Sequence, residues 1–570
     1  QKTAYEIGVR LVGSEMCIRD SGHPTMKSSR LIFPIFLLIT LIAFYPTIGA
    51  GFVFDFLGWQ RAYDAGTFTD IFTSFGYKGN HQALHFFFYS LYSIFHIRGL
   101  PWYLIFCSLH AFNGWLLYAW LTQINTRWKI NAPGLLIILM CILFLVHPYN
   151  VEVVVWKVCV HYLLSLAAVM ALVLFIPKYL YQADTKFLWL CLGMYFVSIF
   201  LLEIAYITPL VISLYLVIEA FAGKRSEFNI RRAVTLSSSL WILLAFGILL
   251  NKLTIGAWVG HYGAAAHLNI DIIGMMSTEL KYLVKHIADA RFFSFKTKGL
   301  IFDNLLSKPE LVFFLMMMCI GIALLYFIRI KKVSGYIHLV FFGMAASMLY
   351  VLPVSNLFFY HLQIGSNDRF SYLPLVFIIV AFLPLFSKTP KWVWVPLMGI
   401  IIMVQLYLQE KTINYWRQST EIVHQLRDTF RWHDRSHVFV LNSPDNLNGI
   451  VMTSIIQAPS GIDELLDFQT SKPYTGVMYD VFQYNMTTPN DGVKVEQTGP
   501  MQIKVTFNQW GNWWHLSGIG ASSYENEYFK AETLDYPYQL TFKQFPEGSA
   551  IIYQDGKEWK EFKLETSSEK

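Results

Sequence analysis

Charged residues are scarce in this chain. Asp, Glu, Lys and Arg make up 14% of its 570 residues, whereas hydrophobic residues make up 55% and aromatic residues 17%. A typical soluble globular domain carries about 25% charged residues, so the composition excludes an ordinary soluble protein. The net charge of +6 reflects short basic loops between apolar runs, and it gives no reason to expect a nucleic-acid partner.

Cysteine is also rare, and its positions exclude two kinds of site. Six cysteines occur, and five of them lie in or beside apolar runs: Cys107, Cys141, Cys159, Cys191 and Cys319. They are typical of small packing residues, and their spacing gives neither a disulfide framework nor a metal site. The sequence requires no cofactor, and a divalent metal has no motif to support it.

Long apolar runs are what the chain has in abundance. Crossing a bilayer as a helix takes roughly 17 to 25 residues, and about eleven runs approach that length. They span residues 31–50, 100–122, 132–147, 158–176, 187–202, 204–222, 234–251, 311–328, 337–352, 370–386 and 392–408. The sequence therefore predicts an all-α polytopic membrane protein of about eleven transmembrane helices.

Basic residues recur at every second junction between these runs. They fall at 27–30, 127–129, 178–186, 224–232, 329–332 and 388–391. Because short cytoplasmic loops carry an excess of Lys and Arg, the pattern predicts a cytoplasmic amino terminus and an outer carboxyl-terminal region. We expect an integral protein of the bacterial inner membrane. This topology requires that residues 81–97 lie at the membrane surface, and the alternative is a true span there.

The remaining sequence divides into four parts. Val12 to Ser21 resembles a translated sequencing adapter, so residues 1–25 are expected to be foreign. Residues 26–409 form the membrane body, 410–435 a connecting amphipathic helix, and 436–570 a small β-rich extracytoplasmic domain. In that domain 437–442 is predicted to be a strand and 443–449 a turn. The domain shows no helical repeat period.

A polar insertion at about 253–309 interrupts the body. It contains Glu279, Lys285, His286 and Arg291, which makes it too polar for a span and too long for a simple connection. Two interpretations remain open: helices that lie on the membrane surface, or a lid that contacts an acceptor or a lipid.

Ionisable groups cluster at the predicted outer ends of the spans, where burying them is costly and often serves a function. They are Asp55, His147, Glu152, Lys157, His161, Glu203, Asp368 and Arg369. Structural alternatives exist: Asp55 could cap a helix, His147 with Pro148 could end one, Glu203 could pair inside the bundle, and Arg369 could anchor at the interface.

Four stretches in this region resemble a known family. Phe144 to Trp156 is similar to the His-Pro-x-x-Val-Glu-x-Val-x-Trp signature of membrane O-mannosyltransferases that carry TPR repeats, and of their bacterial relatives. The stretches 202–209, 351–356 and 368–374 follow in the same order as family motifs, and Asp55 stands where the family keeps an acid. Here Phe56 replaces the family's second acid, and no TPR array follows.

The resemblance implies a GT-C glycosyltransferase that moves a sugar, with inversion, from a polyprenyl-phosphate donor to an acceptor hydroxyl on a glycan, lipid or protein. It makes Asp55 the general base. Arg369, with His147 or Lys157, would hold the leaving phosphate, Glu152 and Glu203 would orient these cations or bind sugar hydroxyls, and Tyr372 belongs to the same substrate site. Membrane lipids are the other expected partners. A lipid-linked sugar transporter or flippase, or a non-catalytic scaffold, remains the alternative.

The alternating basic loops make the topology testable with reporter fusions. Fusions after Arg127, Arg232 and Lys332 should report the cytoplasm, and fusions after Gly260 and Asn446 the outside. A cytoplasmic signal after Asn446 would mean that the number of spans differs from eleven by an odd number.

Overall fold

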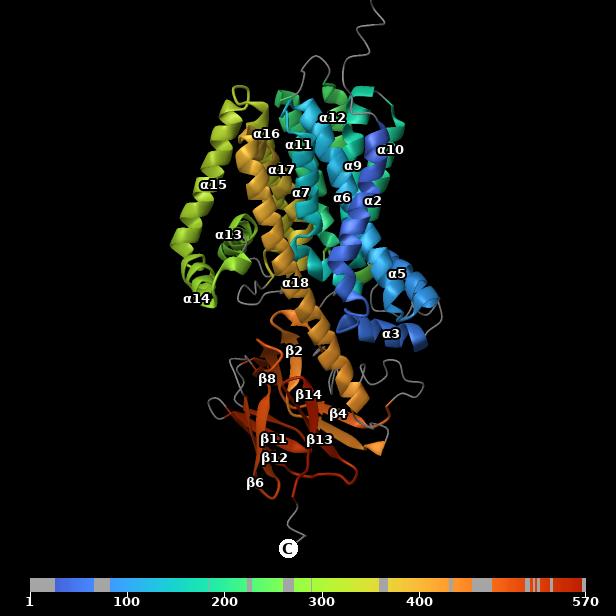
Figure 1. The fold of residues 1–570 in the computed structure, drawn as a ribbon, viewed down its shortest axis with the longest axis vertical. Coiled ribbons are helices and arrows are strands. Elements are labelled where there is room, and N and C mark those ends of the chain that lie inside the picture. Colours follow the sequence, from blue (N-terminus) through green and yellow to red (C-terminus); the bar gives the residue numbers. More distant parts are fainter. Residues whose placement is uncertain are drawn as a thin grey trace, which may run out of the picture.

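The computed structural model of the chain describes residues 26–65, 82–182, 184–222, 228–259, 271–288, 290–357, 367–429, 434–453, 474–507, 513–515, 518–519, 523–533 and 537–565. These residues form a helical body joined to a β-rich region at one end (Figure 1). The predicted adapter segment, 1–25, lies outside the described residues.

Most of the body consists of helices that run along its long axis. They are α2 (Met26–Phe44), α6 (Gly99–Arg127), α7 (Gly134–Leu145), α8 (Val151–Val155), α9 (Val160–Gln182), α10 (Lys186–Leu201), α11 (Thr208–Ala222), α12 (Ile230–Ile255), α15 (Pro309–Arg329), α16 (Gly335–Val351), α17 (Tyr372–Lys388) and α18 (Lys391–Thr429). Each of the eleven predicted apolar runs coincides with one of these helices, although α7 ends before residue 147 and a short 3₁₀ turn and α8 follow it.

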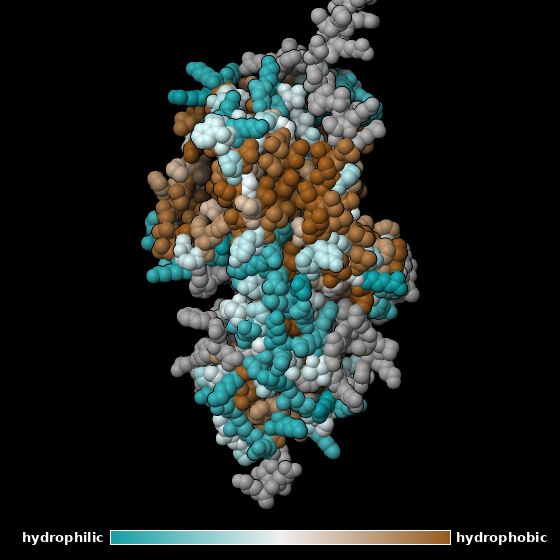
Figure 2. Space-filling model, viewed as in Figure 1, coloured by the Kyte–Doolittle hydropathy of each residue, from teal (hydrophilic) through white to brown (hydrophobic). Residues whose placement is uncertain are grey.

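Eight helical segments in the described residues are long and apolar enough to cross a membrane. Gly134–Leu145 and Pro148–Val155, bent by 46°, make a ninth if they are counted as one span, and Leu31–Thr47 and Lys186–Leu201 are apolar but shorter. Apolar residues form a belt across the body, with hydrophilic residues at its far end and over the β-rich region (Figure 2). This is the architecture of an integral membrane protein.

Two short helices lie beside the end of the body that faces the β-rich region (Figure 1). They are α3 (Asp55–Ala65) and α5 (Gln82–Phe95), and the rings of Phe56 and Phe88, one from each helix, pack 5.8 Å apart. The segment Leu84–Phe95 is apolar but shorter than a candidate span. Whether residues 81–97 lie at the membrane surface stays a prediction, because Leu31–Thr47 and Lys186–Leu201 are apolar helices of the same shorter class.

The polar insertion folds into helical pieces packed against the body. They are α13 (Ile272–Ala288), a 3₁₀ turn (Ala290–Phe292), α14 (Phe295–Lys298) and a π-helical turn (Gly299–Leu305). Helix α13 contacts α15, α16 and α17. Its buried residues include Glu279, Lys285 and His286. The insertion therefore contributes charged side chains to the interior of the body, which helices that only lie on the membrane surface would not do.

Helix α18 joins the two parts of the molecule without a break. Its 39 residues span about 58 Å at 1.5 Å per residue, far longer than a hydrocarbon core of about 30 Å. The last predicted span and the predicted connecting helix, as far as Thr429, are thus one helix. Its far half holds the β-rich region, because Ser419 Oγ donates to Val451 O at 2.8 Å and Trp559 Nε1 donates to Ile422 O at 2.9 Å.

The predicted β-rich region is confirmed. Its strands are β1 (His437–Val440), β2 (Ser443–Leu447), β3 (Ile450–Val451), β4 (Val477–Asp480), β5 (Gln483–Met486), β6 (Val493–Gly499), β7 (Gln502–Phe507), β8 (Trp513–His515), β9 (Gly518–Ile519), β10 (Ser523–Glu525), β11 (Phe529–Thr533), β12 (Tyr538–Phe542), β13 (Ala550–Asp555) and β14 (Glu558–Phe562). They form sheets with the strand orders β14-β13-β1-β4, β10-β11-β12-β7-β6 and β3-β2-β5-β8-β9. Alternation explains these strands, since every second residue of β7 and β12 is buried.

The predicted turn at 443–449 is wrong for most of its length. Residues 443–447 form β2, which pairs in parallel with β5, and the turn is confined to Asn448 and Gly449, with φ of 50° and 88°. A type I′ hairpin turn needs positive φ at both central residues, and Asn-Gly supplies it most readily. The polar residues before the turn are strand residues because their backbone groups pair with β5.

Gly51 offers a test of how tightly the loop before α3 is packed. Its φ is +82°, and a Cβ atom there would lie 2.0 Å from Val155 O. Gly51→Ala should lower the free energy of unfolding by about 2 kcal/mol or more, measured by thermal unfolding in detergent micelles. Gly49 is a matched control, because its φ is +87° but nothing lies within 4 Å of an added Cβ. Equal losses from both alanine variants would contradict this packing.

A cluster of buried charges at the end of the helical body

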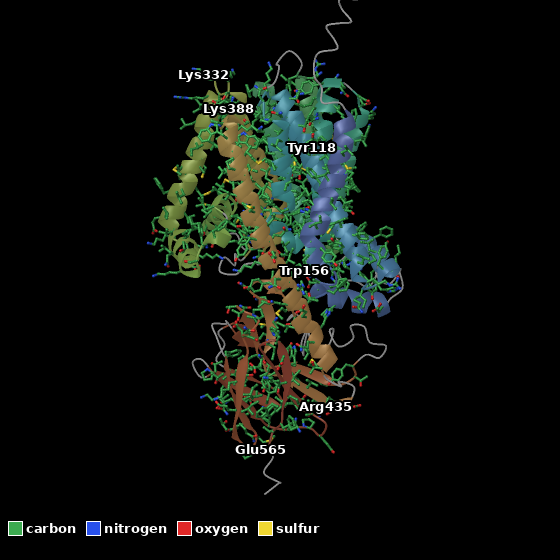
Figure 3. All side chains as sticks on the ribbon, viewed as in Figure 1. Tyr118, Trp156, Lys332, Lys388, Arg435 and Glu565 are labelled. Atoms are coloured by element: carbon green, nitrogen blue, oxygen red, sulfur yellow. The ribbon has the colours of Figure 1, made fainter. Side chains whose placement is uncertain are left out.

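The candidate site lies at the end of the body that faces the β-rich region. Trp156 marks this end in Figure 3, whereas Lys332 and Lys388, from two basic junctions, lie at the opposite end. The break between α7 and α8 occurs here, because a 3₁₀ turn at Pro148–Asn150 interrupts the helix. Irregular backbone of this kind leaves side chains at the ends of helices, where they can meet residues from other segments.

The loop that leads to Asp55 is fixed by two other elements. Gly51 N donates to Thr420 Oγ1 at 3.2 Å, and His424 Nε2 lies 3.0 Å from Phe52 O, both on α18. From the other side, Trp156 Nε1 donates to Val53 O at 3.3 Å. Asp55 is the first residue of α3. Its position therefore depends on α18 and on the α8 end of the body.

Glu152 and Arg369 form the first ion pair of the site. Arg369 donates from its backbone N to Glu152 Oε2 at 2.7 Å and from Nη1 to Glu152 Oε1 at 2.5 Å. The glutamate side chain is almost fully buried, and the arginine side chain is 25% exposed. Arg369 also lies over the ring of Trp156, 5.4 Å from its centroid. One carboxylate oxygen thus holds the backbone of Arg369, and the other holds its guanidinium.

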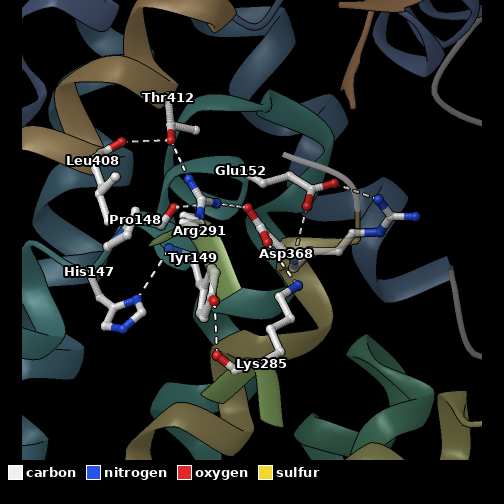
Figure 4. A network of polar contacts seen from close by, with 10 residues as sticks. His147, Pro148, Tyr149, Glu152, Lys285, Arg291, Asp368, Leu408 and Thr412 are labelled. Atoms are coloured by element: carbon white, nitrogen blue, oxygen red, sulfur yellow. Dashed lines mark hydrogen bonds and ion pairs between the residues drawn. The ribbon is translucent and has the colours of Figure 1, made fainter. Parts of the chain in front are cut away.

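Asp368, the residue before Arg369, forms ion pairs with two cationic side chains of the polar insertion (Figure 4). Lys285 Nζ lies 2.9 Å from Asp368 Oδ1, and Arg291 donates to Oδ2. Arg291 also donates to Thr412 Oγ1 of α18 and to Pro148 O. The ring of Tyr149 lies between the two cations, 4.8 Å from Lys285 Nζ and 4.9 Å from Arg291. Asp368 thus binds the insertion to the body.

Lys298, at the end of α14, adds a further positive charge. It is 6% exposed, and within the described part of the chain neither a hydrogen bond nor an ion pair is found for its side chain. Burial, together with the positive charge of Arg291, lowers its pKa from 10.5 to about 8, although Asp368 opposes the change. A buried ammonium with reduced proton affinity is the expected result of too much positive charge in one place.

These six residues form the polar cluster: Glu152, Lys285, Arg291, Lys298, Asp368 and Arg369. It contains four cationic and two anionic side chains, so it carries a surplus of positive charge when all of them are ionised. Burying an uncompensated charge is unfavourable. An anion bound there would remove the imbalance, and arginine and lysine are the side chains that bind phosphate.

Asp55 and Glu203 border this cluster. Cys159 lies within electrostatic range of Asp55, Glu152 and Arg369, and Tyr162 lies within range of Glu203, Glu152 and Arg369. Glu203 begins a 3₁₀ turn between α10 and α11. Each predicted carboxylate therefore shares one neighbouring side chain with the Glu152–Arg369 pair.

Two predicted site residues, His147 and Tyr372, occupy different surroundings. His147 caps a 3₁₀ turn, with its Nδ1 accepting from Tyr149 N at 3.2 Å. Tyr372 is fully buried, and its hydroxyl contacts His110 Nδ1 at 2.8 Å and Asn113 Nδ2 at 3.1 Å. The cluster does not include either residue. His147 serves as the helix boundary that was its structural alternative, and Tyr372 joins α17 to α6.

Lys157 is fully buried behind the Asp55 loop. Its Nζ has no hydrogen-bond partner among the described residues, and it lies 5.3 Å from the ring centroid of Phe106 and 5.7 Å from that of Phe52. Aromatic faces stabilise a cation in part. Lys157 therefore adds positive charge near the loop, but the structure shows no contact between it and the polar cluster.

Sequence reasoning did not single out Lys285, Arg291 and Lys298 as site residues. They belong to the insertion, whose lid interpretation placed it near the site without naming side chains. Asp368, the partner of Lys285 and Arg291, is 77 residues beyond Arg291, so no local spacing could reveal these contacts. The one available signal was that the insertion carries several cations in a chain that has few charges.

No group of three or more His, Cys, Asp or Glu residues in the described ranges could hold a metal ion. In comparisons with known proteins, neither a protein family nor a curated protein matches the chain. Inferences about function therefore depend on the residues themselves.

Lys298 allows a test of anion binding that does not disturb a structural ion pair. Lys298→Met should leave thermal stability unchanged or raised, because no partner is lost, and should weaken binding of farnesyl phosphate about tenfold, measured by calorimetry. Wild-type affinity should fall as the pH rises through about 8, the pKa of Lys298, because the neutral amine no longer attracts phosphate.

The matched control is Lys296→Met, since Lys296 is on the same short helix but exposed. It should bind the probe as the wild type does. If Lys298→Met keeps both the wild-type affinity and the wild-type pH dependence, Lys298 is not an anion ligand.

Proposed function

We propose that the chain is an inverting glycosyltransferase that takes its sugar from a polyprenyl-phosphate donor at the end of the body bearing the polar cluster. The observation that carries this proposal is the surplus of buried positive charge at one end of an apolar helical body. A lipid phosphate has the complementary form, because its apolar tail suits the helices and its anion suits the cluster.

The proposed orientation places the cluster outside the cytoplasm. The basic junctions that include Lys332 and Lys388 lie at the opposite end (Figure 3), and basic loops favour the cytoplasmic side. Eleven spans, counting the bent pair once and including the two shorter apolar helices, would put the β-rich region outside. The site would then face donors and acceptors at the outer membrane–water boundary of a bacterial inner membrane.

In the proposed reaction an acceptor hydroxyl attacks the anomeric carbon of the donor sugar. The new carbon–oxygen bond forms as the bond to the phosphate oxygen breaks, so the anomeric configuration inverts and the bonding electrons leave with polyprenyl phosphate. Asp55 takes the hydroxyl proton as general base. Cys159 lies within electrostatic range of Asp55 and of the Glu152–Arg369 pair, which supports a shared site.

Stabilisation of the leaving phosphate is assigned to the cations of the cluster. Glu152 holds the backbone of Arg369 with one carboxylate oxygen and its guanidinium with the other. The planar donor group is therefore positioned before the donor binds. Preorganised donors of this kind stabilise developing charge without reorganising during the reaction. Lys285, Arg291 and Lys298 come from the insertion, so the proposal makes the insertion a lid that completes the phosphate site.

The β-rich region is the proposed support for the acceptor. It is held by α18 through Ser419 and Ile422, within five residues of Thr420 and His424, which fix the Asp55 loop. An acceptor resting on this region would approach the general base from the water side. Whether that acceptor is a glycan, a lipid or a protein does not change the chemistry.

Asp55→Asn tests the reaction directly, because the amide keeps the side-chain shape and removes its basicity. Transfer of labelled sugar from a polyprenyl-phosphate donor should fall by roughly 10² to 10⁴, while donor binding and thermal stability stay near wild type. The measurement is single-turnover transfer by purified protein.

Asp64→Asn is the control on the same helix, since Asp64 accepts hydrogen bonds from Gln60 at 3.0 Å and Tyr92 at 2.7 Å and has no proposed catalytic role. It should retain transfer. Wild-type rates from Asp55→Asn would remove the base assignment, and lipid movement without any transfer by the wild type would favour a transporter.

A further inference from the structure

Helix α13 has two different faces. Ser277 and Lys281 point to the following turn, where Ser277 donates to Leu306 O and Lys281 Nζ donates to Ser307 Oγ at 3.0 Å. Glu279, Tyr282 and His286 are spaced i, i+3 and i+7, which places them together on another face. All three are buried. Tyr282 links this second face to the polar cluster, because Lys285 Nζ lies 5.3 Å from the centroid of its ring.

Glu279 is the most unusual residue on this face. It is 5% exposed, and both of its carboxyl oxygens are buried without a hydrogen-bond partner in the described part of the chain. Buried polar groups are almost always hydrogen-bonded, because leaving one unpaired costs about 1 to 3 kcal/mol. Two unpaired oxygens on one side chain indicate that a partner other than the described residues completes the site.

His286, further along the same face, is also buried with an unpaired polar atom. It is 7% exposed, and its Nε2 has no hydrogen-bond partner among the described residues. Its ring packs against Tyr282 at 5.8 Å and Tyr149 at 6.2 Å. Seven residues of helix separate Glu279 from His286, or about 10 Å. This distance matches the dimensions of one or two sugar rings.

Both groups favour their neutral forms. Burial raises the pKa of Glu279 from 4.5 to about 8, so at neutral pH the carboxyl group is mostly protonated and can both donate and accept a hydrogen bond. Burial, with Lys285 nearby, holds the pKa of His286 well below 6.5. The face therefore suits a neutral polyhydroxylated group better than an ion.

This face is directed toward the polar cluster. Tyr282, which lies between Glu279 and His286 along the helix, has its ring centroid 5.3 Å from Lys285 Nζ. Lys285, the residue before His286, pairs with Asp368. A ligand whose anionic part contacts the cluster would therefore place its next group beside this face.

We propose that Glu279 and His286 bind hydroxyl groups of the sugar attached to the lipid phosphate, so that this face of α13 recognises the transferred sugar. This rests on the proposed function and adds a sugar subsite to it. Glu279 is then a specificity residue that distinguishes a glycosylated lipid phosphate from the bare one.

The test compares two probes on the purified full chain: a short polyprenyl phosphate that carries a hexose, and the same polyprenyl phosphate without it. The wild type should bind the hexose-bearing probe about tenfold more tightly by calorimetry. Glu279→Leu should lose this preference and keep its affinity for the bare phosphate. Glu279→Gln, whose amide can still donate and accept, should keep part of the preference.

Lys281→Gln is the matched control, because it changes the other face of the same helix and should keep the full preference. Thermal unfolding separates binding from folding: Glu279→Leu should be at least as stable as the wild type, since an unpaired buried carboxyl has been removed.

An undiminished preference in Glu279→Leu would overturn the inference, as would equal binding of both probes by the wild type, which leaves the phosphate site intact. Binding of neither probe would overturn the proposed function as well.

Discussion

Charge buried at the end of an apolar bundle must be compensated, and Asp368 is the residue on which this compensation depends. Its carboxylate pairs with Lys285 and Arg291, and the next residue, Arg369, pairs with Glu152. Removing one member of a buried pair costs about 3 to 5 kcal/mol. These few contacts fix the positions of the insertion, the break after α7 and the start of α17 relative to one another. Arg291 extends the connection to helix α18 by donating to Thr412.

The same arrangement relates the two parts of the molecule. Helix α18 carries Thr412 at the cluster, Thr420 at the Asp55 loop and Ser419 at the β-rich region. A single rigid helix therefore sets the distance between the proposed phosphate site, the proposed base and the proposed acceptor support. Catalysis that depends on positioning needs this kind of preorganisation.

Much of this fold could be predicted from sequence, because apolar runs and strand alternation are local signals. Asp55, Glu152, Glu203 and Arg369 could be found as costly polar groups at span ends. Lys285 and Lys298 could not, since their positions depend on how the insertion folds back over the body. Tyr372 shared a motif with Arg369, yet its hydroxyl turns inward to His110, which motif membership does not reveal.

The proposed reaction depends on one property of the protein: the polar cluster holds the phosphate of a prenyl lipid. Native mass spectrometry of the purified chain, after brief delipidation and addition of an equimolar mixture of polyprenyl phosphate and bilayer phospholipids, tests it most directly. We predict selective retention of the polyprenyl phosphate, and loss of that selectivity when Lys298 is replaced by Met. Retention of phospholipids in proportion to their abundance, with no preference for the prenyl lipid, would contradict the claim.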